Sequence, residues 1–436
     1  MCSPFHSTKG LDHVTRLRLR TPLALLLLVL TGTCALFAAP PKTTVTLWHH
    51  WDGDRAKYVQ HILDEFMAAN PDVQAEQMFT STGGAVDKLG TMLAAGAAPE
   101  VVMVRSTYAN RIIRLGGLTP LDPLIRQDKI NTAMFFPADV HTFQEDGRLY
   151  ALPVMSGVAW TNLMFYNKRL MAEAGLPGEA PTTWTEWRQM SLRMMRRDSS
   201  SRIVSGGSDM PPSVWVAPWN NTPMWTADWK KATANNERMI ETMTFLKGLL
   251  EAQYGSYGEY TAFNGTGFAS AFMTDRQGFS VRNSSSFAHM PNTPVDWGVA
   301  LAPKNEAHAD TEPTGLVLST WGYGIPNTVA GQKLEAAWKL LKWLAINEQG
   351  AGWFARVQGR PSAVIRYNQH PEYRRTNPYW DVVIRSTEHV AVTPPVSVEV
   401  MNGPLAQILT GHAHMQQGTA DAERLLQNAL DDYWAR

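Results

Sequence analysis

Short apolar segments alternate with segments of helical period along most of the chain, and this alternation constrains the fold more than any other feature. The runs at 44–48, 73–79 and 100–104 are short and mostly apolar, and they predict strands. Between them, 55–69 and 86–95 place apolar side chains three and four positions apart, which predicts amphipathic helices. Near-continuous apolar strands joined by helices are typical of a parallel sheet covered on both faces. The sequence therefore predicts an α/β fold.

The same alternation continues to the C-terminus, with a second α/β region after Pro153. Thr183 and Glu186 have the spacing of a capping box at the start of one of its helices. The further helices are expected at 107–115, 168–174, 184–196, 236–253, 332–346, 402–415 and 419–434, and the further strands at 278–281, 295–300 and 320–325.

The first 39 residues have the pattern of an export signal. Three arginines precede an apolar run at 23–30, and small residues follow it before Pro40. We therefore expect a signal peptide at 1–39 and a periplasmic protein after cleavage. No later stretch reaches the roughly 18 uninterrupted apolar residues of a membrane-spanning helix.

Both cysteines of the chain, Cys2 and Cys34, fall in this prefix. The exported chain is therefore expected to form no disulfide and to contain no thiolate site. A lipid anchor on Cys34 is the less favoured alternative, because one residue too many separates Leu30 from Cys34 for the usual lipid-attachment pattern.

The composition excludes two classes of protein. Charged residues make up 18% of the chain and hydrophobic residues 44%, whereas an average soluble domain has roughly 25% charged residues. A long disordered chain is therefore excluded, and so is a basic nucleic-acid-binding domain. We expect no nucleic-acid partner.

Catalytic and metal-binding patterns are not found in the sequence. It has no Gly-x-Ser-x-Gly, phosphate-binding loop or His-Glu-x-x-His. His412 and His414 lack a third ligand at a suitable spacing, so no metal and no cofactor are predicted. Asp52 and Asp54 stand two residues apart in one loop, which does not suit a glycosidase pair on opposite sides of a bond. We expect ligand hydrogen bonding there and no catalysis.

Several of the 16 tryptophans lie in segments without helical period. Trp219 and Trp225 fall in a Pro- and Asn-rich stretch, and Trp321 lies among glycines, whereas Trp338 has the spacing of a helix core. Each such side chain could serve ordinary packing. Together they favour a site that stacks on the flat faces of sugar rings.

An ordered set of segments extends over nearly the whole chain after the prefix. The set is 44–51, 89–104, 149–153, 165–168, 173–176, 181–186, 302–303, 322–326 and 336–344. It resembles the family 1 extracellular solute-binding proteins of bacterial sugar ABC importers. The resemblance implies a two-lobed periplasmic binding protein fold, each lobe a mainly parallel sheet flanked by helices. It also implies a hinge, one carbohydrate ligand, docking on ABC permease subunits, and a monomer.

The resemblance also implies lobe boundaries and ligand contacts. The N-terminal lobe is expected at 40–152 plus 306–357, and the C-terminal lobe at 153–305 plus 358–436. Contacts are expected in the loops after strands, at the late cross-over and from the aromatic stretch, with the register of Ser156 left open. These residues are His50, Trp51, Asp52, Arg105, Ser106, Tyr108, Ser156, Trp219, Trp225, Asn283, Ser284, Ser285, Trp321, Gly322, Arg360 and Glu399.

The ligand class depends on one departure from a subgroup. Pro394-Pro395 and Asn402-x-Pro404 resemble the glycerol-phosphate binders, in which an arginine near that step holds the phosphate. Glu399 stands there in this chain, and a carboxylate repels a phosphate, so we expect a neutral sugar. A phosphorylated ligand remains the alternative if Arg105 or Arg360 compensates. A secreted glycosidase is the alternative from another class.

Overall fold

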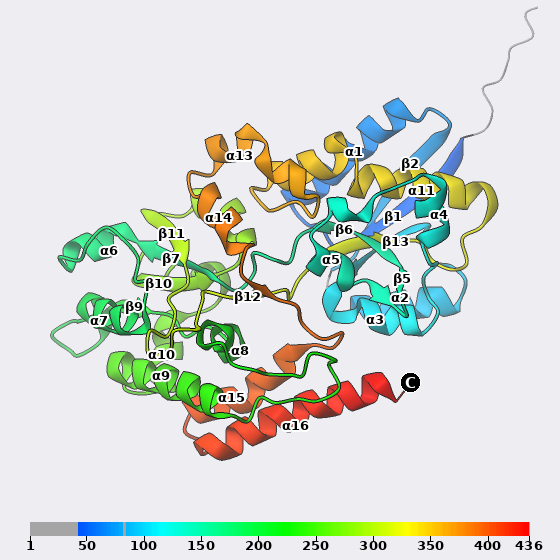
Figure 1. Ribbon diagram of the computed structural model, residues 1–436. Coiled ribbons are helices and arrows are strands. Elements are labelled where there is room, and N and C mark those ends of the chain that lie inside the picture. The colour runs from blue at the N-terminus through cyan, green and yellow to red at the C-terminus, as the bar shows by residue number, and fades with distance from the viewer. Residues whose placement is uncertain (1–41, 82–83, 436) are drawn as a thin grey trace, which may run out of the picture. The chain divides into compact units, whose positions relative to one another are not determined.

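The computed structural model describes residues 42–81 and 84–435 (Figure 1). The expected signal peptide and both cysteines lie outside these residues. Within them, no helix combines the length and the apolar character needed to cross a membrane.

The first sheet has five strands in the order β2-β1-β3-β13-β6. β1 pairs in parallel with β2 and with β3, whereas β13 runs antiparallel to both β3 and β6. The strands are β1 (Thr43–His49), β2 (Val73–Phe79), β3 (Val101–Arg105), β6 (Ala151–Met155) and β13 (Trp321–Gly324). The helices beside this sheet are α1 (Asp54–Ala69), α2 (Ala85–Ala94), α3 (Ser106–Arg114) and α11 (Gly331–Ala345).

The second sheet also has five strands, in the order β11-β7-β10-β9-β8. Only β10 and β9 pair in parallel, and the other neighbours are antiparallel. The strands are β7 (Leu163–Asn167), β8 (Arg196–Arg197), β9 (Ile203–Ser208), β10 (Gln277–Arg282) and β11 (Trp297–Leu301). The helices on this side are α6 (Lys168–Glu173), α7 (Trp184–Met194), α9 (Glu237–Tyr254), α10 (Tyr257–Asn264), α15 (Asn402–Leu409) and α16 (Met415–Trp434).

The expectation of mainly parallel sheets fits the first sheet better than the second. In the first sheet only β13 runs against the other four strands, whereas the second sheet is mixed, because an apolar run shows that a strand is buried but not in which direction it runs. The helix expected at 402–415 ends at Leu409, since Gly411 takes a left-handed φ of 77°, and the helix expected at 419–434 begins earlier, at Met415.

The capping box at α7 is confirmed with a shift of one residue. Thr183 Oγ1 accepts a hydrogen bond from the backbone N–H of Glu186 (3.2 Å), and the Glu186 carboxylate accepts one from the backbone N–H of Thr182 (2.8 Å). The remaining short elements are α4 (Asp122–Gln127), α5 (Pro137–His141), β4 (Gln144–Glu145), β5 (Arg148–Leu149), α8 (Ser213–Val216), β12 (Gly315–Leu316), α12 (Trp353–Val357), α13 (Pro371–Thr376), α14 (Trp380–Ser386) and β14 (Val390–Ala391).

A buried carboxylate fastens the two segments that link the sheets. Asp139 of α5 is fully buried, and its Oδ1 accepts hydrogen bonds from the backbone N–H of Gly157 (3.0 Å) and from the Thr320 hydroxyl (2.5 Å). Gly157 lies between β6 and β7, and Thr320 immediately precedes β13. Asp139 therefore holds together the outgoing and the returning chain.

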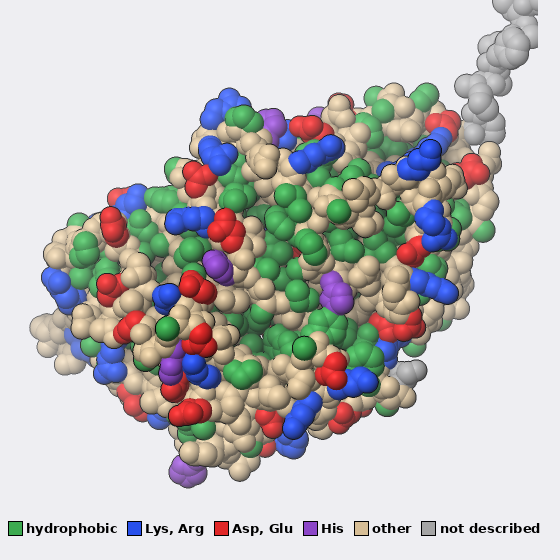
Figure 2. All heavy atoms as spheres, in the orientation of Figure 1, with side chains coloured by type: hydrophobic (Ala, Val, Ile, Leu, Met, Phe, Trp, Pro, Cys, Tyr) green, Lys and Arg blue, Asp and Glu red, His purple; other side chains and the backbone are tan. Residues whose placement is uncertain are grey.

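On the face shown in Figure 2, acidic and basic side chains of the described residues are interspersed. No extended basic patch of the kind that binds nucleic acid is seen among the described residues of that face.

Replacing Trp338 with alanine is expected to lower the free energy of unfolding by about 3–5 kcal/mol. The indole of Trp338 is buried on α11, and its Nε1 donates a hydrogen bond to Asp128 (3.0 Å). Lys339→Ala on the same helix is the matched control, since Lys339 forms only an exposed ion pair with Asp72. Denaturant melts measure both variants, and equal losses would contradict the assignment of Trp338 to the core.

The pH dependence of stability is expected to report on Asp139. Burial raises the pKa of this carboxyl to about 6, so the folded state binds a proton more tightly than the unfolded state. Stability therefore falls as pH rises from about 4 to about 6, by up to about 3 kcal/mol for this group. Asp139→Asn removes the contribution, and the difference between the two melting curves measures it. A difference independent of pH would contradict the burial of a titrating carboxyl.

Candidate ligand-binding site

The strand order brings three predicted site residues to one edge of the first sheet. β1 and β3 pair in parallel, so their carboxyl ends lie at the same edge. Trp51 follows β1 and Arg105 ends β3, at the edge where α/β sheets usually bind ligands. β13 runs in the opposite direction, so its first residue, Trp321, is the register partner of Arg105.

The two indoles at this edge differ in role. Trp51 is 2% exposed, donates through Nε1 to the Tyr323 hydroxyl (3.0 Å) and packs edge-on against Phe354. Trp321 lies against it, with 5.4 Å between ring centroids, and the Arg105 guanidinium carbon is 5.4 Å from the Trp321 centroid. Trp51 therefore supports the site from beneath, and Trp321 forms its aromatic wall.

The Arg360 guanidinium is buried beside the indole of Trp51. It is 2% exposed, and its Nε and Nη2 atoms have no hydrogen-bond partner among the described residues. The guanidinium carbon lies 5.8 Å from the ring centroid of Trp51 and 5.9 Å from that of Trp160. A buried guanidinium with free N–H groups between two indoles is ready to donate to oxygen atoms of a bound molecule.

Electrostatics around Arg360 are unfavourable without a ligand. Burial, together with the positive charges of Arg55 and Arg105, lowers the pKa of Arg360 to about 9. Asp52 pairs with Arg55, and the Arg55 hydrogen bond holds the Asp52 pKa below its usual value. The Asp52 carboxylate is thus committed to Arg55 and leaves Arg360 uncompensated.

His50 and Tyr108 come together, but they satisfy each other. Burial lowers the pKa of His50, so its ring is neutral near pH 7. His50 Nδ1 donates to the carbonyl of Thr80 (2.7 Å), and Nε2 accepts from the Tyr108 hydroxyl (3.1 Å). The pair fixes the loop after β1, and both ring nitrogens of His50 are occupied by these two hydrogen bonds.

The second sheet contributes through the loop after β10. Asn283 accepts from the backbone N–H and from the hydroxyl of Ser285, which fixes this turn. The backbone N–H of Ser284 donates to the carbonyl of Ala159 (3.2 Å), next to Trp160, and the buried Ser284 hydroxyl has no partner among the described residues. The loop therefore lies beside the indole that faces Arg360.

Four of the expected contact residues have packing or backbone contacts in the structure. Trp219 is fully buried in the second core, 5.9 Å from the centroid of Trp187, and its role as a ligand contact stays a prediction. Trp225 packs against the same core. Gly322 has its role in packing, because a Cβ there would meet the carbonyl oxygen of Leu152 at 2.9 Å. The Ser156 hydroxyl accepts from the backbone N–H of Val158 within the link between the sheets.

Ser106 and Glu399 line a different cavity, described below. Burial lowers the pKa of Arg105. The negative charge of Glu399 is close enough to oppose this shift. The sequence analysis did not include Arg55, Trp160 or His289 in the site. Arg55 stands in the first turn of an ordinary helix, and only tertiary contacts place His289 near Arg55, Asp52 and Arg360.

The structure has two five-stranded sheets linked by more than one chain crossing, and aromatic and cationic side chains gather at the strand ends. This combination is typical of a solute-binding protein. The family model described as bacterial extracellular solute-binding protein matches residues 52–351. The chain belongs to this family.

Relatives and structures of known ligand agree with the assignment. The sn-glycerol-3-phosphate-binding periplasmic protein UgpB of Yersinia pestis is 22% identical over 89% of this chain and 90% of its own. The ABC substrate-binding protein Lmo0181 of Listeria monocytogenes, in complex with cycloalternan, superposes with a TM-score of 0.73 at 20% identity, over 89% of this chain and 98% of its own. Maltose-bound MalE3 of T. maritima superposes with a TM-score of 0.72 at 18% identity, over 88% of this chain and 99% of its own. The fold is thus that of the two-lobed binding proteins.

Arg360→Met is expected to stabilise the ligand-free protein by about 1–3 kcal/mol, because it removes buried N–H groups without partners. The control is Arg238→Met, which separates Arg238 from Asp310 (Nη2 to Oδ1, 3.0 Å) and should not gain stability. Thermal melts without ligand measure both. Equal losses in the two variants would show that Arg360 is already compensated.

Proposed function

We propose that the protein is the substrate-binding component of a carbohydrate ABC importer, which captures a sugar or oligosaccharide and delivers it to the permease. The observation that carries the proposal is the buried, unpartnered guanidinium of Arg360 between the indoles of Trp51 and Trp160. Aromatic faces stack on sugar rings, and guanidinium N–H groups donate to ring hydroxyls. The ligands named for the structural neighbours, cycloalternan and maltose, are of this class.

The proposed mechanism is ligand-dependent closure of two lobes. Trp321 and Arg105 belong to the first sheet, whereas Trp160 and Ser284 lie beside the second. A ligand that contacts both groups favours the closed state by its difference in affinity between the two states. We propose a monomer that is exported to the periplasm and whose closed form docks on the permease.

The lobe boundaries remain part of the proposal. The scheme with 40–152 plus 306–357 in one lobe is supported in outline by the two sheets. The strands of each sheet support small shifts of these lobe boundaries. β6 continues the first sheet to Met155, and β12 pairs with β14 before the chain returns to the first sheet at β13. Glu306 accepts from the backbone N–H groups of Trp184 and Thr185, so it lies with α7.

We further propose that the protein is not an enzyme. A glycosidase needs two carboxyl groups about 5–9.5 Å apart across the bond that is cleaved. Asp52 is held by Arg55, and its side chain is 63% exposed. Its pKa is lowered, whereas a general acid requires a raised one.

A second candidate ligand is an anionic polyol such as glycerol phosphate. The specific observation in its favour is that Arg360 has no ion-pair partner among the described residues, while Arg105 and Arg55 add positive charge nearby. The similarity to UgpB supports the same candidate. Glu399 opposes it, since its charge acts at Arg105.

A ligand screen by thermal shift, with maltose, trehalose, longer glucans and glycerol 3-phosphate, tests the proposal. A ligand at 100 times its Kd stabilises the protein by about 2.7 kcal/mol. We expect a neutral sugar to give the largest shift, with little dependence on salt because no long-range charge is screened. A larger, salt-sensitive shift with glycerol 3-phosphate would instead establish the second candidate, and no shift with any of them would contradict both.

Trp321→Ala is expected to weaken ligand binding by about 1–3 kcal/mol and also to lower the melting temperature without ligand, because its ring is 8% exposed and packs in the first core. Trp338→Ala should lower the melting temperature but leave ligand binding unchanged, since the Trp338 indole packs on α11 and donates to Asp128. Titration calorimetry on both alanine variants separates the two roles. Wild-type affinity in Trp321→Ala would exclude this ring from the site.

A further inference from the structure

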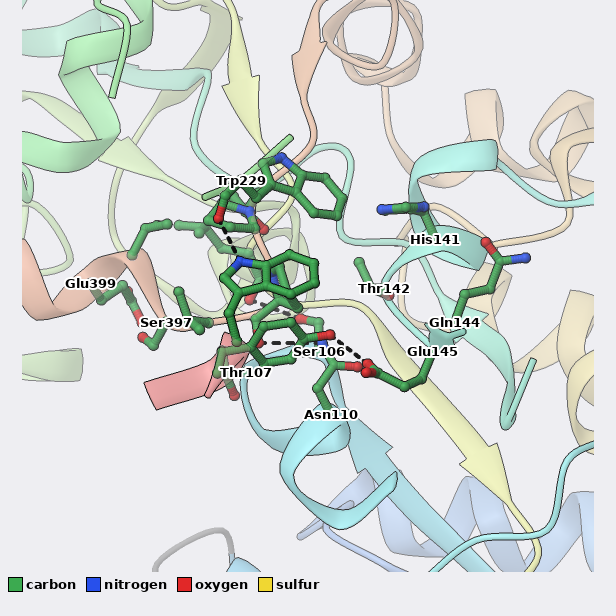
Figure 3. A pocket seen from close by; sticks show the side chains of 18 of the residues that line it. Ser106, Thr107, Asn110, His141, Thr142, Gln144, Glu145, Trp229, Ser397 and Glu399 are labelled. Atoms are coloured by element: carbon green, nitrogen blue, oxygen red, sulfur yellow. Dashed lines mark hydrogen bonds between the residues drawn. The ribbon is translucent and has the colours of Figure 1, made fainter. Parts of the chain in front are cut away.

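A second cavity of about 270 Å³ lies beside the returning segment 317–320, and its lining comes from both parts of the chain. Ser106 and Asn110 of α3 and Glu145 of β4 line one side of it. Trp229, the segment 393–399 and the end of α16 line the other (Figure 3). At about 30 Å³ per water molecule, the space would accept roughly nine waters or a small organic molecule.

The returning segment separates this cavity from the Arg360 site. Side chains of an extended chain alternate between two sides. The Ser319 side chain is on the side of the first site, where its Oγ accepts a hydrogen bond from Arg105 Nε (2.9 Å). The neighbouring Leu318 lines the cavity. The Ser106 hydroxyl, which also lines the cavity, donates to the Leu318 carbonyl (3.2 Å). The two sites are therefore distinct.

Aromatic rings form one wall. Trp434 Nε1 donates to the carbonyl of Trp229 (2.9 Å), so the end of α16 and the 229 loop are held together. Figure 3 shows the Trp229 ring on the side opposite Gln144. These rings already attract cations: the Arg114 guanidinium carbon is 3.5 Å from the Tyr433 centroid, and Lys230 Nζ is 5.8 Å from that of Trp434.

The charge of the lining has one sign. Three carboxylates line the cavity, those of Glu145, Asp146 and Glu399, and no Lys or Arg is among the described lining residues. Glu145 is satisfied by Arg114 (Nε to Oε1, 2.8 Å) and by the Tyr433 hydroxyl. The Glu399 carboxylate forms no hydrogen bond or ion pair with another described residue, and only its backbone carbonyl accepts one, from the backbone N–H of Asn402. Burial lowers the pKa of His141, so its ring adds no positive charge near pH 7.

Asn110, in the wall of the cavity, holds an unpartnered acceptor. Asn110 is 5% exposed, and its Nδ2 donates to the carbonyl of Pro395 (3.3 Å), which fixes the orientation of the amide. Its buried Oδ1 then has no donor among the described residues. A buried acceptor without a donor is costly unless a bound molecule supplies an N–H or O–H group.

We propose that this cavity is a second ligand site, for a small protonated primary amine with an apolar or aromatic body. The ammonium group donates to the Glu399 carboxylate, and the body lies against Trp229 and the prolines of 394–395. An anion is disfavoured by the three carboxylates. The site goes beyond the proposed sugar site and does not depend on which sugar is bound.

Calorimetric titration with phenethylammonium and with 2-phenylethanol tests the proposal on the purified protein. The two probes share one body, and only the first carries a charge. We expect phenethylammonium to bind at least tenfold more tightly. Equal affinities, or no binding of the amine, would overturn the proposal.

Variants locate the amine. Glu399→Gln is expected to weaken amine binding at least tenfold and to leave 2-phenylethanol unchanged, whereas Glu388→Gln, at an exposed position, changes neither. Asn110→Leu should weaken both probes, and it tests the cavity independently of charge. Trp321→Ala, in the first site, should leave amine binding unchanged. Loss of amine binding in Trp321→Ala would place the amine in the first site and overturn the proposal.

Discussion

The insertion of β13 between β3 and β6 is the constraint on which both sites depend. β13 is antiparallel to both neighbours, so its first residue lies at the edge where β3 ends, and Trp321 is paired with Arg105. The residues just before β13 then pass along α3, where Ser106 and Arg105 hold them by hydrogen bonds. Asp139 fastens the same segment to the outgoing chain at Gly157. The strand thus places Trp321 beside Arg105, and the segment before it runs between the Arg360 site and the cavity.

The first site is built at a cost to stability. A guanidinium is buried beside two other arginines, with donors that the described chain leaves unpaired. Local rules of polar satisfaction are commonly broken at functional sites, where the compensating interaction comes from the ligand. The surrounding residues are well satisfied, as the His50–Tyr108 pair and the Trp51–Tyr323 hydrogen bond show. The contrast singles out Arg360 as the group that the ligand completes.

The sequence predicted the regular elements well where apolar periodicity was strong. β2 has the predicted bounds, and α1 starts one residue early, because buried Val59, Ile62, Leu63 and Phe66 mark one helix face. Strand direction could not be read from apolar runs. The fold around Trp219 could not be read either, because this Pro-rich stretch forms short helical turns that carry the ring into the core.

The site was predictable only in part, and for a similar reason. The loops after β1 and β3 follow from the α/β pattern, which led to Trp51 and Arg105. Trp160 and Arg55 give no local signal, since their role depends on segments distant in sequence. The second cavity is lined from several such segments, and the sequence gives no sign of it beyond the isolated Glu399.

The most direct test of the account is the ¹⁵N NMR signal of the Arg360 Nε–H group, assigned through its loss in Arg360→Lys. The ligand found in the screen is added to protein labelled at arginine Nε. The account predicts that the Arg360 signal shifts and that its hydrogen exchanges more slowly, because a ligand oxygen accepts from it. Saturation of the protein with ligand while the Arg360 signal remains unchanged would contradict it.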